Sequence, residues 1–138
     1  MRALKIVAAL VVAALMVLLA LGGLSYAASE SGEVVVLTTA GGDGGELQQT
    51  RIWVVDLEGR QWLRSGSPDS AWLARLRLNP VVTVERSGAS AQYTAAATPA
   101  MQEAVNEAMA AKYGWADKVI GMMFGREDAV PVELIPRS

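Results

Sequence analysis

The sequence contains neither cysteine nor histidine among its 138 residues. Without cysteine the chain can form no disulfide, no thiol nucleophile and no iron–sulfur ligand. Without histidine it lacks the usual general base and the commonest ligand of transition metals. Apart from carboxylates, only Lys112 and Lys118 of the soluble part could serve as a base, and neither follows a Ser-x-x-Lys pattern. The sequence therefore identifies no catalytic residue and predicts no metal site.

Basic residues are also scarce beyond residue 29. That part of the chain has ten basic residues against fourteen acidic ones, a net charge of −4. A general nucleic-acid binder needs a basic surface, so we expect no nucleic acid among the partners.

Charged and polar side chains are absent from Ile6 to Leu21, and Arg2 and Lys5 stand just before this run. A positive start followed by an apolar stretch is typical of a signal peptide or a signal anchor. A buried core helix would show a polar face, which this segment lacks. We therefore divide the chain into a targeting segment, residues 1–29, and one domain, residues 30–138.

Whether this segment is cleaved stays open. The apolar run through Leu24 is about as long as the roughly 20 residues that cross a bilayer, which favours a single-pass anchor in the cell membrane. Ser25-Tyr26-Ala27 has the small first and third residues of a signal-peptidase site, so secretion after cleavage near Ala27 is the alternative. In either case the basic end stays in the cytoplasm, and the domain should lie outside it.

The rest of the chain predicts a mainly β (α+β) fold. Apolar, β-branched runs end at turn residues, and two helices are expected to begin with a hydroxyl residue followed by proline, at Ser67-Pro68-Asp69 and at Thr98-Pro99. Consecutive strands joined by tight turns pair antiparallel, and six of them commonly close into a small barrel. The expected strands are 34–39, 50–57, 60–65, 81–86, 91–97 and 130–135, and the expected helices 67–78, 98–113 and 115–124.

Two arginines are the main candidates for binding an anion. Arg51 follows Thr50 and Arg64 precedes Ser65, each near the end of a predicted apolar strand, and a guanidinium beside a hydroxyl makes a good phosphate clamp. The alternative is that both arginines point into solvent, as arginine usually does. The glycine cluster at 41–45 could cradle a phosphate with its amides, but it also reads as a loose hairpin loop without a ligand.

Several segments, in this order, resemble the flavin-binding split-barrel superfamily of pyridoxamine-phosphate oxidases and deazaflavin-dependent nitroreductases. The nearest likeness is to an uncharacterised bacterial branch, and it covers roughly residues 33–136. The segments that carry it are Val36-Leu37-Thr38-Thr39, Thr50-Arg51-Ile52-Trp53-Val54-Val55, Trp62-Leu63-Arg64-Ser65-Gly66, Ala71-Trp72-Leu73, Leu78-Asn79-Pro80-Val81-Val82-Thr83-Val84 and Lys112-Tyr113-Gly114.

The resemblance implies a six-stranded antiparallel split β-barrel with two or three short helices and an FMN or deazaflavin cofactor. It also implies a groove at a homodimer interface, where the cofactor would lie. The residues implied for this site are Arg51, Ile52 and Trp53 at the ring or ribityl tail, Arg64, Ser65 and Gly66 at the phosphate, and Trp72 packed beside them.

The functional hypothesis is a membrane-anchored, oxidoreductase-like protein in which a flavin or deazaflavin transfers hydride to an unknown small molecule. The shortage of acid–base residues agrees with this, since the cofactor would supply the chemistry. Many deazaflavin relatives have a basic Gly-Arg-Lys-x-Gly loop where this chain has the acidic Gly42-Asp43-Gly44-Gly45-Glu46. That difference favours the alternative, a cofactor-free barrel that acts as a binding or envelope-interaction module.

Overall fold

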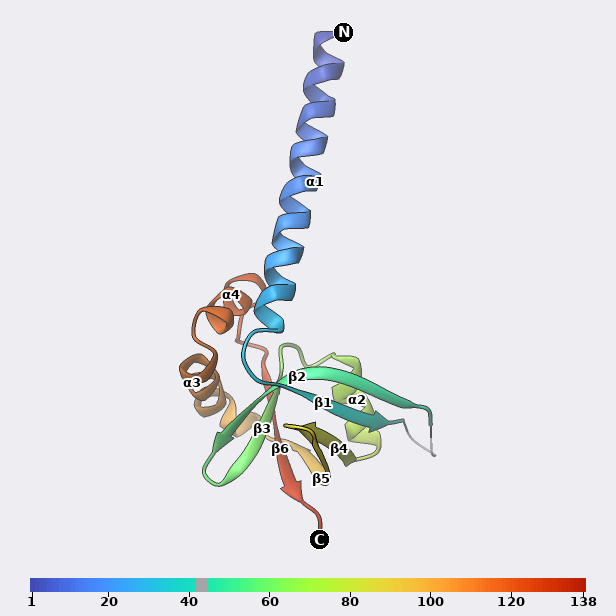
Figure 1. Ribbon diagram of the computed structural model, residues 1–138, viewed down its shortest axis with the longest axis vertical. Coiled ribbons are helices and arrows are strands. Elements are labelled where there is room, and N and C mark those ends of the chain that lie inside the picture. Colours follow the sequence, from blue (N-terminus) through green and yellow to red (C-terminus); the bar gives the residue numbers. More distant parts are fainter. Residues whose placement is uncertain (42–44) are drawn as a thin grey trace.

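The computed structural model describes residues 1–41 and 45–138. One long helix rises from a small barrel, so the N-terminus lies far from the barrel and the C-terminus at its opposite end (Figure 1). The elements are α1 (Arg2–Ser29), β1 (Val34–Ala40), β2 (Leu47–Leu57), β3 (Arg60–Ser65), α2 (Ala71–Leu78), β4 (Val81–Arg86), β5 (Ala89–Ala97), a 3₁₀ turn (Pro99–Met101), α3 (Gln102–Tyr113), α4 (Trp115–Phe124) and β6 (Val130–Pro136).

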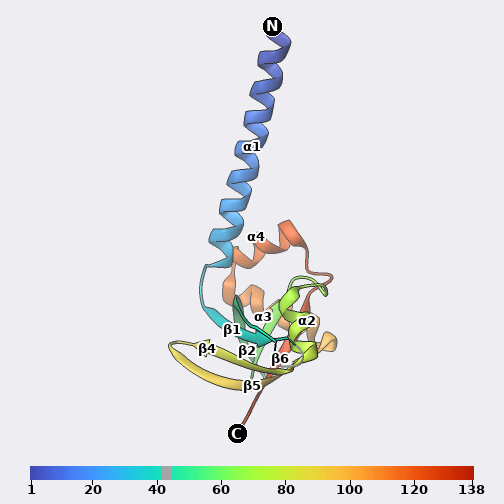
Figure 2. The same ribbon diagram turned by 90° about the vertical axis from the view of Figure 1, so that its right-hand side faces the viewer.

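Six antiparallel strands close into a barrel in the order β1-β2-β3-β6-β5-β4, which confirms the predicted fold class (Figure 2). Two hairpin turns fix the register of four of these strands. Both central residues of each turn have positive φ, Glu58 (55°) with Gly59 (74°) and Ser87 (52°) with Gly88 (80°). Turns of this conformation match the twist of paired strands, and glycine in the second position adopts it without steric cost.

The barrel interior is filled by every second residue of the strands, and α2 contributes to the same core. Trp72, Leu73 and Leu76 of α2 pack with strand residues such as Leu37 and Leu63, all less than 9 % exposed. The predicted start of this helix at Ser67-Pro68-Asp69 is wrong. The Ser67 hydroxyl accepts only a local bond from the Asp69 amide (3.1 Å), and the helix begins at Ala71 after Ser70.

A second apolar cluster lies outside the barrel wall. Trp53, Val55 and Trp62 point outward from β2 and β3, while Val54 and Leu63 beside them point inward. Helices α3 and α4 and the last turn of α1 cover the outward residues, which explains why this part of the sequence is apolar on both faces. The helical members of the cluster are Ala28, Val105, Met109, Tyr113 and Ala116.

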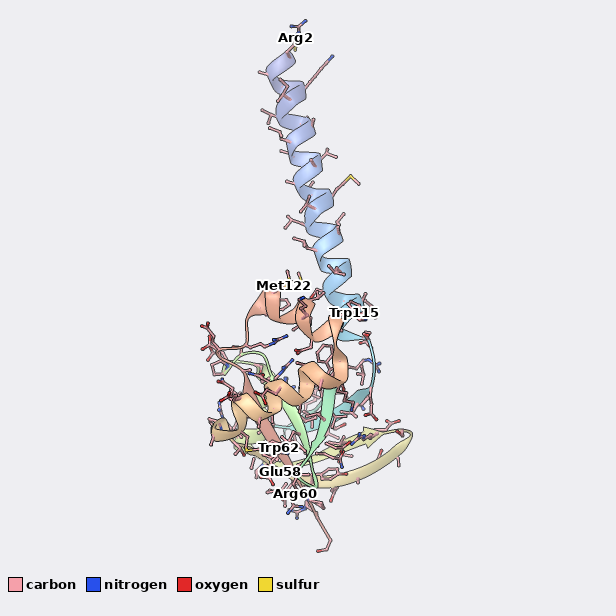
Figure 3. The ribbon with its side chains drawn as sticks, turned by 90° about the vertical axis from the view of Figure 1, so that its left-hand side faces the viewer. Arg2, Glu58, Arg60, Trp62, Trp115 and Met122 are labelled. Carbon is pink, nitrogen blue, oxygen red and sulfur yellow. The ribbon has the colours of Figure 1, made fainter. Side chains whose placement is uncertain are left out.

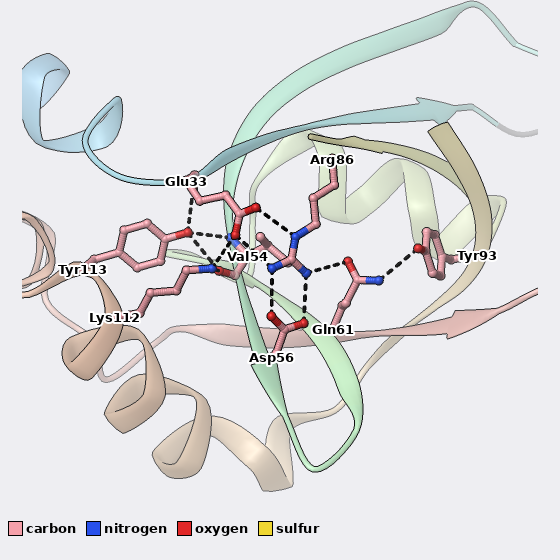
Figure 4. Close-up of polar contacts among 8 residues, drawn as sticks. All are labelled: Glu33, Val54, Asp56, Gln61, Arg86, Tyr93, Lys112 and Tyr113. Atoms are coloured by element: carbon pink, nitrogen blue, oxygen red, sulfur yellow. Dashed lines mark hydrogen bonds and ion pairs between the residues drawn. The ribbon is translucent and has the colours of Figure 1, made fainter. Parts of the chain in front are cut away.

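An ion-pair network ties the linker after α1 to the barrel and to α3 (Figure 4). Arg86 bonds the carboxylates of Glu33 (2.9 Å) and Asp56 (2.8 Å), and Lys112 bonds Glu33 at 2.7 Å. The hydrogen bonds from Arg86 lower the pKa of both carboxyls below their ordinary values, and Lys112 lowers that of Glu33 further. The network holds the linker at Glu33, immediately before β1 begins.

This network predicts acid-sensitive stability. Because the pKa values of Glu33 and Asp56 are lower in the folded state, their contribution is present above pH 4.5 and is lost as the pH falls through the depressed values. We expect Arg86→Met to lower the unfolding free energy by about 1–2 kcal/mol at pH 7, allowing for solvent exposure, and by progressively less as the pH falls below 4.5. Thermal unfolding in detergent micelles measures this loss of stability, with a substitution of the exposed Arg77, Arg77→Met, as control. If the stability difference between Arg86→Met and the unaltered protein did not change with pH, the ion pairs of Arg86 would not be its cause.

Candidate functional site

A groove runs across the outer face of β2 and β3, between the end of α1, the start of α2 and α4. It consists of two adjoining hollows of about 160 and 450 Å³ that share Arg51, Ile52, Arg64 and Gly66. The larger one falls within the range of roughly 300–1,000 Å³ that is usual for small-molecule sites. Ser29, Trp53 and Ile120 complete the smaller hollow, and Thr50, Ser65, Ser67, Ser70, Trp72 and Phe124 complete the larger.

All seven residues that the resemblance implied for the site line this groove. β2 pairs with β3 from Val54↔Leu63 to Leu57↔Arg60, and Arg51 and Arg64 lie beyond this paired segment, where both line the groove. The residues that pair with these arginines were not predicted from the sequence. Positions 42–44, which belong to the acidic glycine-rich loop, lie outside the described residues.

Arg51 is held by the linker that follows α1. Its guanidinium makes a two-pronged contact with Glu30, with Nε 3.0 Å from Oε1 and Nη2 2.8 Å from Oε2. The hydrogen bond from Arg51 lowers the pKa of Glu30, and the same bond raises that of Arg51. The Arg51 side chain is 59 % exposed, so a bound anion could compete with Glu30 for it.

Arg64 belongs to a buried cluster. It donates to Asp117 Oδ1 (2.6 Å) and to Asn106 Oδ1 (3.1 Å), and Arg126 donates to the other carboxylate oxygen of Asp117. Asp117 is fully buried, and the Arg64 side chain is only 9 % exposed. Because two guanidinium groups share one carboxylate, the cluster keeps one positive charge beneath the groove.

Arg126 rests on the backbone of α4. A Cβ atom placed on Gly121 would lie 2.7 Å from the guanidinium carbon of Arg126, so only glycine leaves room for this contact. The Arg126 Nε atom is buried and has no hydrogen-bond partner among the described residues.

At the other end of the groove, hydroxyl groups surround the start of α2. Ser65 Oγ lies 2.5 Å from Ser70 Oγ and donates to the Ser67 carbonyl at 2.6 Å. Ser70 stands at the N-cap position of α2 but makes no side-chain capping bond among the described residues. Among the described residues the first amides of α2 have no hydrogen-bond partner, and this end of a helix favours negative charge. Gly66 is exposed beside them, and a Cβ there would meet no atom within 4 Å.

Aromatic rings form the wall of the groove. The Trp53 ring stacks on Tyr113 with 4.1 Å between centroids, and its Nε1 donates to the Ser29 carbonyl (2.8 Å). The Tyr113 hydroxyl donates to the Glu33 carbonyl (2.6 Å) and accepts from the Val54 amide (3.1 Å). Burial raises the pKa of Tyr113 to about 12, so the phenol stays protonated. The stacking and these hydrogen bonds hold Trp53 in place, so this wall of the groove is rigid.

Comparison with known proteins identifies relatives by structure. No protein-family profile matches the chain, and no curated protein matches it in sequence. Solved structures do match. A conserved hypothetical protein from Mycobacterium tuberculosis has 21 % identity over 78 % of this chain and 75 % of that one, with a TM-score of 0.60.

Two further solved structures have names that refer to chemistry. An F420-H2 dependent reductase is 19 % identical over 72 % of this chain and 92 % of its own, with a TM-score of 0.57. A proposed pyridoxamine 5′-phosphate oxidase from Listeria innocua is 17 % identical over 82 % and 90 %, with a TM-score of 0.55. At these identities the likeness establishes the shared fold.

Proposed function

Since this chain has the split β-barrel fold of the flavin-binding superfamily, we propose that its groove binds FMN or a deazaflavin and that the protein supports hydride transfer to a small molecule. The observation that carries the proposal is the convergence of Arg51, Ile52, Trp53, Arg64, Ser65, Gly66 and Trp72 on one groove. The related reductase acts with reduced F420 by name, which favours the same class of cofactor here.

The phosphate of such a cofactor fits the α2 end of the groove. The free first amides of α2, the Ser67 hydroxyl and the open backbone at Gly66 are suitable donors for a phosphate. The positive charge shared by Arg64 and Arg126 over Asp117 lies beneath the same hollow and would attract an anion. Arg64 would act on the phosphate mainly as a fixed charge, because its Nη1 and Nη2 atoms are held by Asn106 and Asp117.

We assign the isoalloxazine-type ring to the smaller hollow, whose apolar lining residues are Ile52, Trp53 and Ile120. When bound, the cofactor supplies the hydride chemistry. Ile52 and Trp53 orient the ring and exclude water from it. Arg51 carries a positive charge at the edge of this hollow and would stabilise negative charge on the reduced ring once a ligand displaces Glu30.

The proposal includes attachment to the cell membrane. Helix α1 is 28 residues long and apolar enough to cross a bilayer, although a signal sequence has the same properties. We take residues 1–29 as an uncleaved anchor and residues 30–138 as an extracytoplasmic barrel domain. A second copy facing the groove would make the homodimer that the resemblance implies.

One observation favours a different function. Glu30 and Asp117 already pair with the two candidate arginines, as they would in a barrel that binds no cofactor and serves as an envelope-interaction module.

A fluorescence titration distinguishes the two functions. We expect FMN or F420 added to the full chain in detergent to quench tryptophan emission, because Trp53 and Trp72 line the groove. Riboflavin, which lacks the phosphate, should bind at least about 10-fold more weakly, a difference of roughly 1.4 kcal/mol for one lost charge-assisted contact. Trp53→Phe should remove most of the quenching. If none of these ligands quenches emission or shifts the ring absorbance, the cofactor-free function is the correct one.

A further inference from the structure

Helix α4 has an exposed stripe that its packing leaves uncovered. Trp115, Lys118 and Met122 lie at positions i, i+3 and i+7, so they share one face. Trp115 is 56 % exposed and Met122 is 79 % exposed. The opposite face of α4 is occupied, since Ala116 packs in the outer apolar cluster and Asp117 pairs with Arg64.

This stripe lies on the side of the domain from which α1 rises. Figure 3 labels Trp115 and Met122 along α4, at the level where α1 joins the domain, and Figure 2 shows α4 running across the foot of α1. The last turn of α1 packs against α4, where Ala28 is fully buried with Ala116. The position of α4 along the axis of α1 is therefore fixed.

The length of α1 determines where α4 lies relative to a membrane. The apolar run from Ile6 to Leu24 spans about 28 Å at 1.5 Å per residue, close to the roughly 30 Å of a hydrocarbon core. The remaining residues to Ser29 extend about 7 Å further, and the headgroup layer on each side is about 5–8 Å thick. The end of α1, together with α4 packed on it, is then at headgroup depth.

We propose that α4 is an interfacial membrane helix, with Trp115 and Met122 inserted at the boundary between headgroups and acyl chains and Lys118 beside the lipid phosphates. The inference goes beyond cofactor binding and depends only on α1 remaining in the membrane. Tryptophan is enriched at this depth, and a lysine can keep its charge among phosphates while its stem stays apolar. Amphipathic helices that lie in this layer bury their apolar face by about 5–10 Å.

Lipid is the occupant that the surroundings favour. The exposed apolar surface of α1 reaches almost to α4, with Leu21 44 % and Leu24 45 % exposed, so one bilayer would cover both. Two apolar side chains and a lysine are too small a patch for a stable dimer, which needs about 800 Å² on each partner. Because Ile120 and Phe124 of the same helix line the groove, the groove would open beside the membrane surface.

The absence of cysteine makes a site-directed test simple. Met122→Cys and, as control, Glu103→Cys on the exposed side of α3 would each carry one nitroxide label in the full chain. The chain is reconstituted in phosphatidylcholine vesicles with a minor fraction of phosphatidylglycerol. We expect the label at 122 to be relaxed several-fold more by oxygen, which concentrates in lipid, than by a water-soluble nickel chelate. The label at 103 should show the reverse.

Two results of the spin-label experiment would overturn the proposal. One is equal relaxation at both positions, which would leave α4 in water. The other is dipolar broadening between labels at 122 without oxygen accessibility, which would mean that a second copy covers the stripe. A measurement without a label uses brominated phosphatidylcholine in the same vesicles. It should quench a component of tryptophan emission that Trp115→Phe removes, and equal fractional quenching in both proteins would also refute insertion. None of these outcomes bears on FMN binding.

Discussion

Replacing Gly66 with aspartate is expected to weaken binding of FMN or F420 by about 100-fold while the barrel stays folded. A Cβ at this position meets no atom within 4 Å, so the new side chain fits. Its carboxylate would lie in the hollow that we assign to the phosphate. Two negative charges about 5 Å apart repel by roughly 3 kcal/mol at an effective dielectric constant near 20, which corresponds to about a 100-fold loss of affinity.

Gly66→Asn is the matched control for this prediction, because asparagine has nearly the same shape without the charge. It should bind FMN within a few-fold of the unaltered protein, and both variants should unfold at nearly the same temperature. The charge effect should also shrink for riboflavin, which has no phosphate to repel. If Gly66→Asp binds FMN as tightly as Gly66→Asn does, the phosphate lies elsewhere.

Replacing Asp117 with alanine should cause the largest loss of stability in the domain, about 3–5 kcal/mol. The fully buried carboxylate bonds both Arg64 and Arg126, and its removal leaves the nearly buried Arg64 without a counter-charge. The same change at exposed Asp128 should cost less than about 0.5 kcal/mol. Thermal unfolding of the three proteins in the same detergent measures the difference.

Asp117→Asn separates the lost charge from the lost packing. It keeps the shape of the side chain, so a large loss of stability in this variant comes from the charge. Since it leaves the positive charge of Arg64 without a counter-charge, we expect FMN to raise its unfolding temperature more than that of the unaltered protein. An Asp117→Ala variant as stable as the control at Asp128 would show that the buried pairing does not stabilise the fold.

The strands and their turns could be predicted because they depend on local patterns. Period-two alternation indicates the strands, and the turn dipeptides Glu58-Gly59 and Ser87-Gly88 indicate the two hairpins β2–β3 and β4–β5. Helix α2 shows the limit of such patterns. Ser67-Pro68-Asp69 has the composition of a helix start, but the hydroxyl bonds of Ser65 with Ser67 and Ser70 hold that segment as a turn.

The lining of the groove followed from resemblance, whereas the partners of its arginines did not. Arg64 and Asp117 are 53 positions apart, and α4 has no local feature that identifies the partner of Asp117. Glu30 lies in a polar linker, and no local pattern there connects it with Arg51. Long-range ion pairs of this kind depend on how the helices pack on the barrel, which a single sequence does not specify.

The groove, the α1 linker and α4 form one structural unit. Ser29, the last residue of α1, bonds Trp53, and Glu30, which follows it, bonds Arg51, while Ile120 of α4 lines the same hollow. A cofactor bound there would contact barrel, linker and helix together. If the groove accepts the anionic, ring-containing ligand that we propose, cofactor binding would therefore be linked to the end of α1.

The most direct measurement of cofactor binding is the visible absorption spectrum of the full chain purified, in its own lipids, from the organism that produces it. We predict flavin or deazaflavin ring bands that co-purify with the protein and are absent from the Gly66→Asp variant prepared in the same way. A colourless protein that stays colourless after incubation with FMN and with F420 would contradict the proposed function.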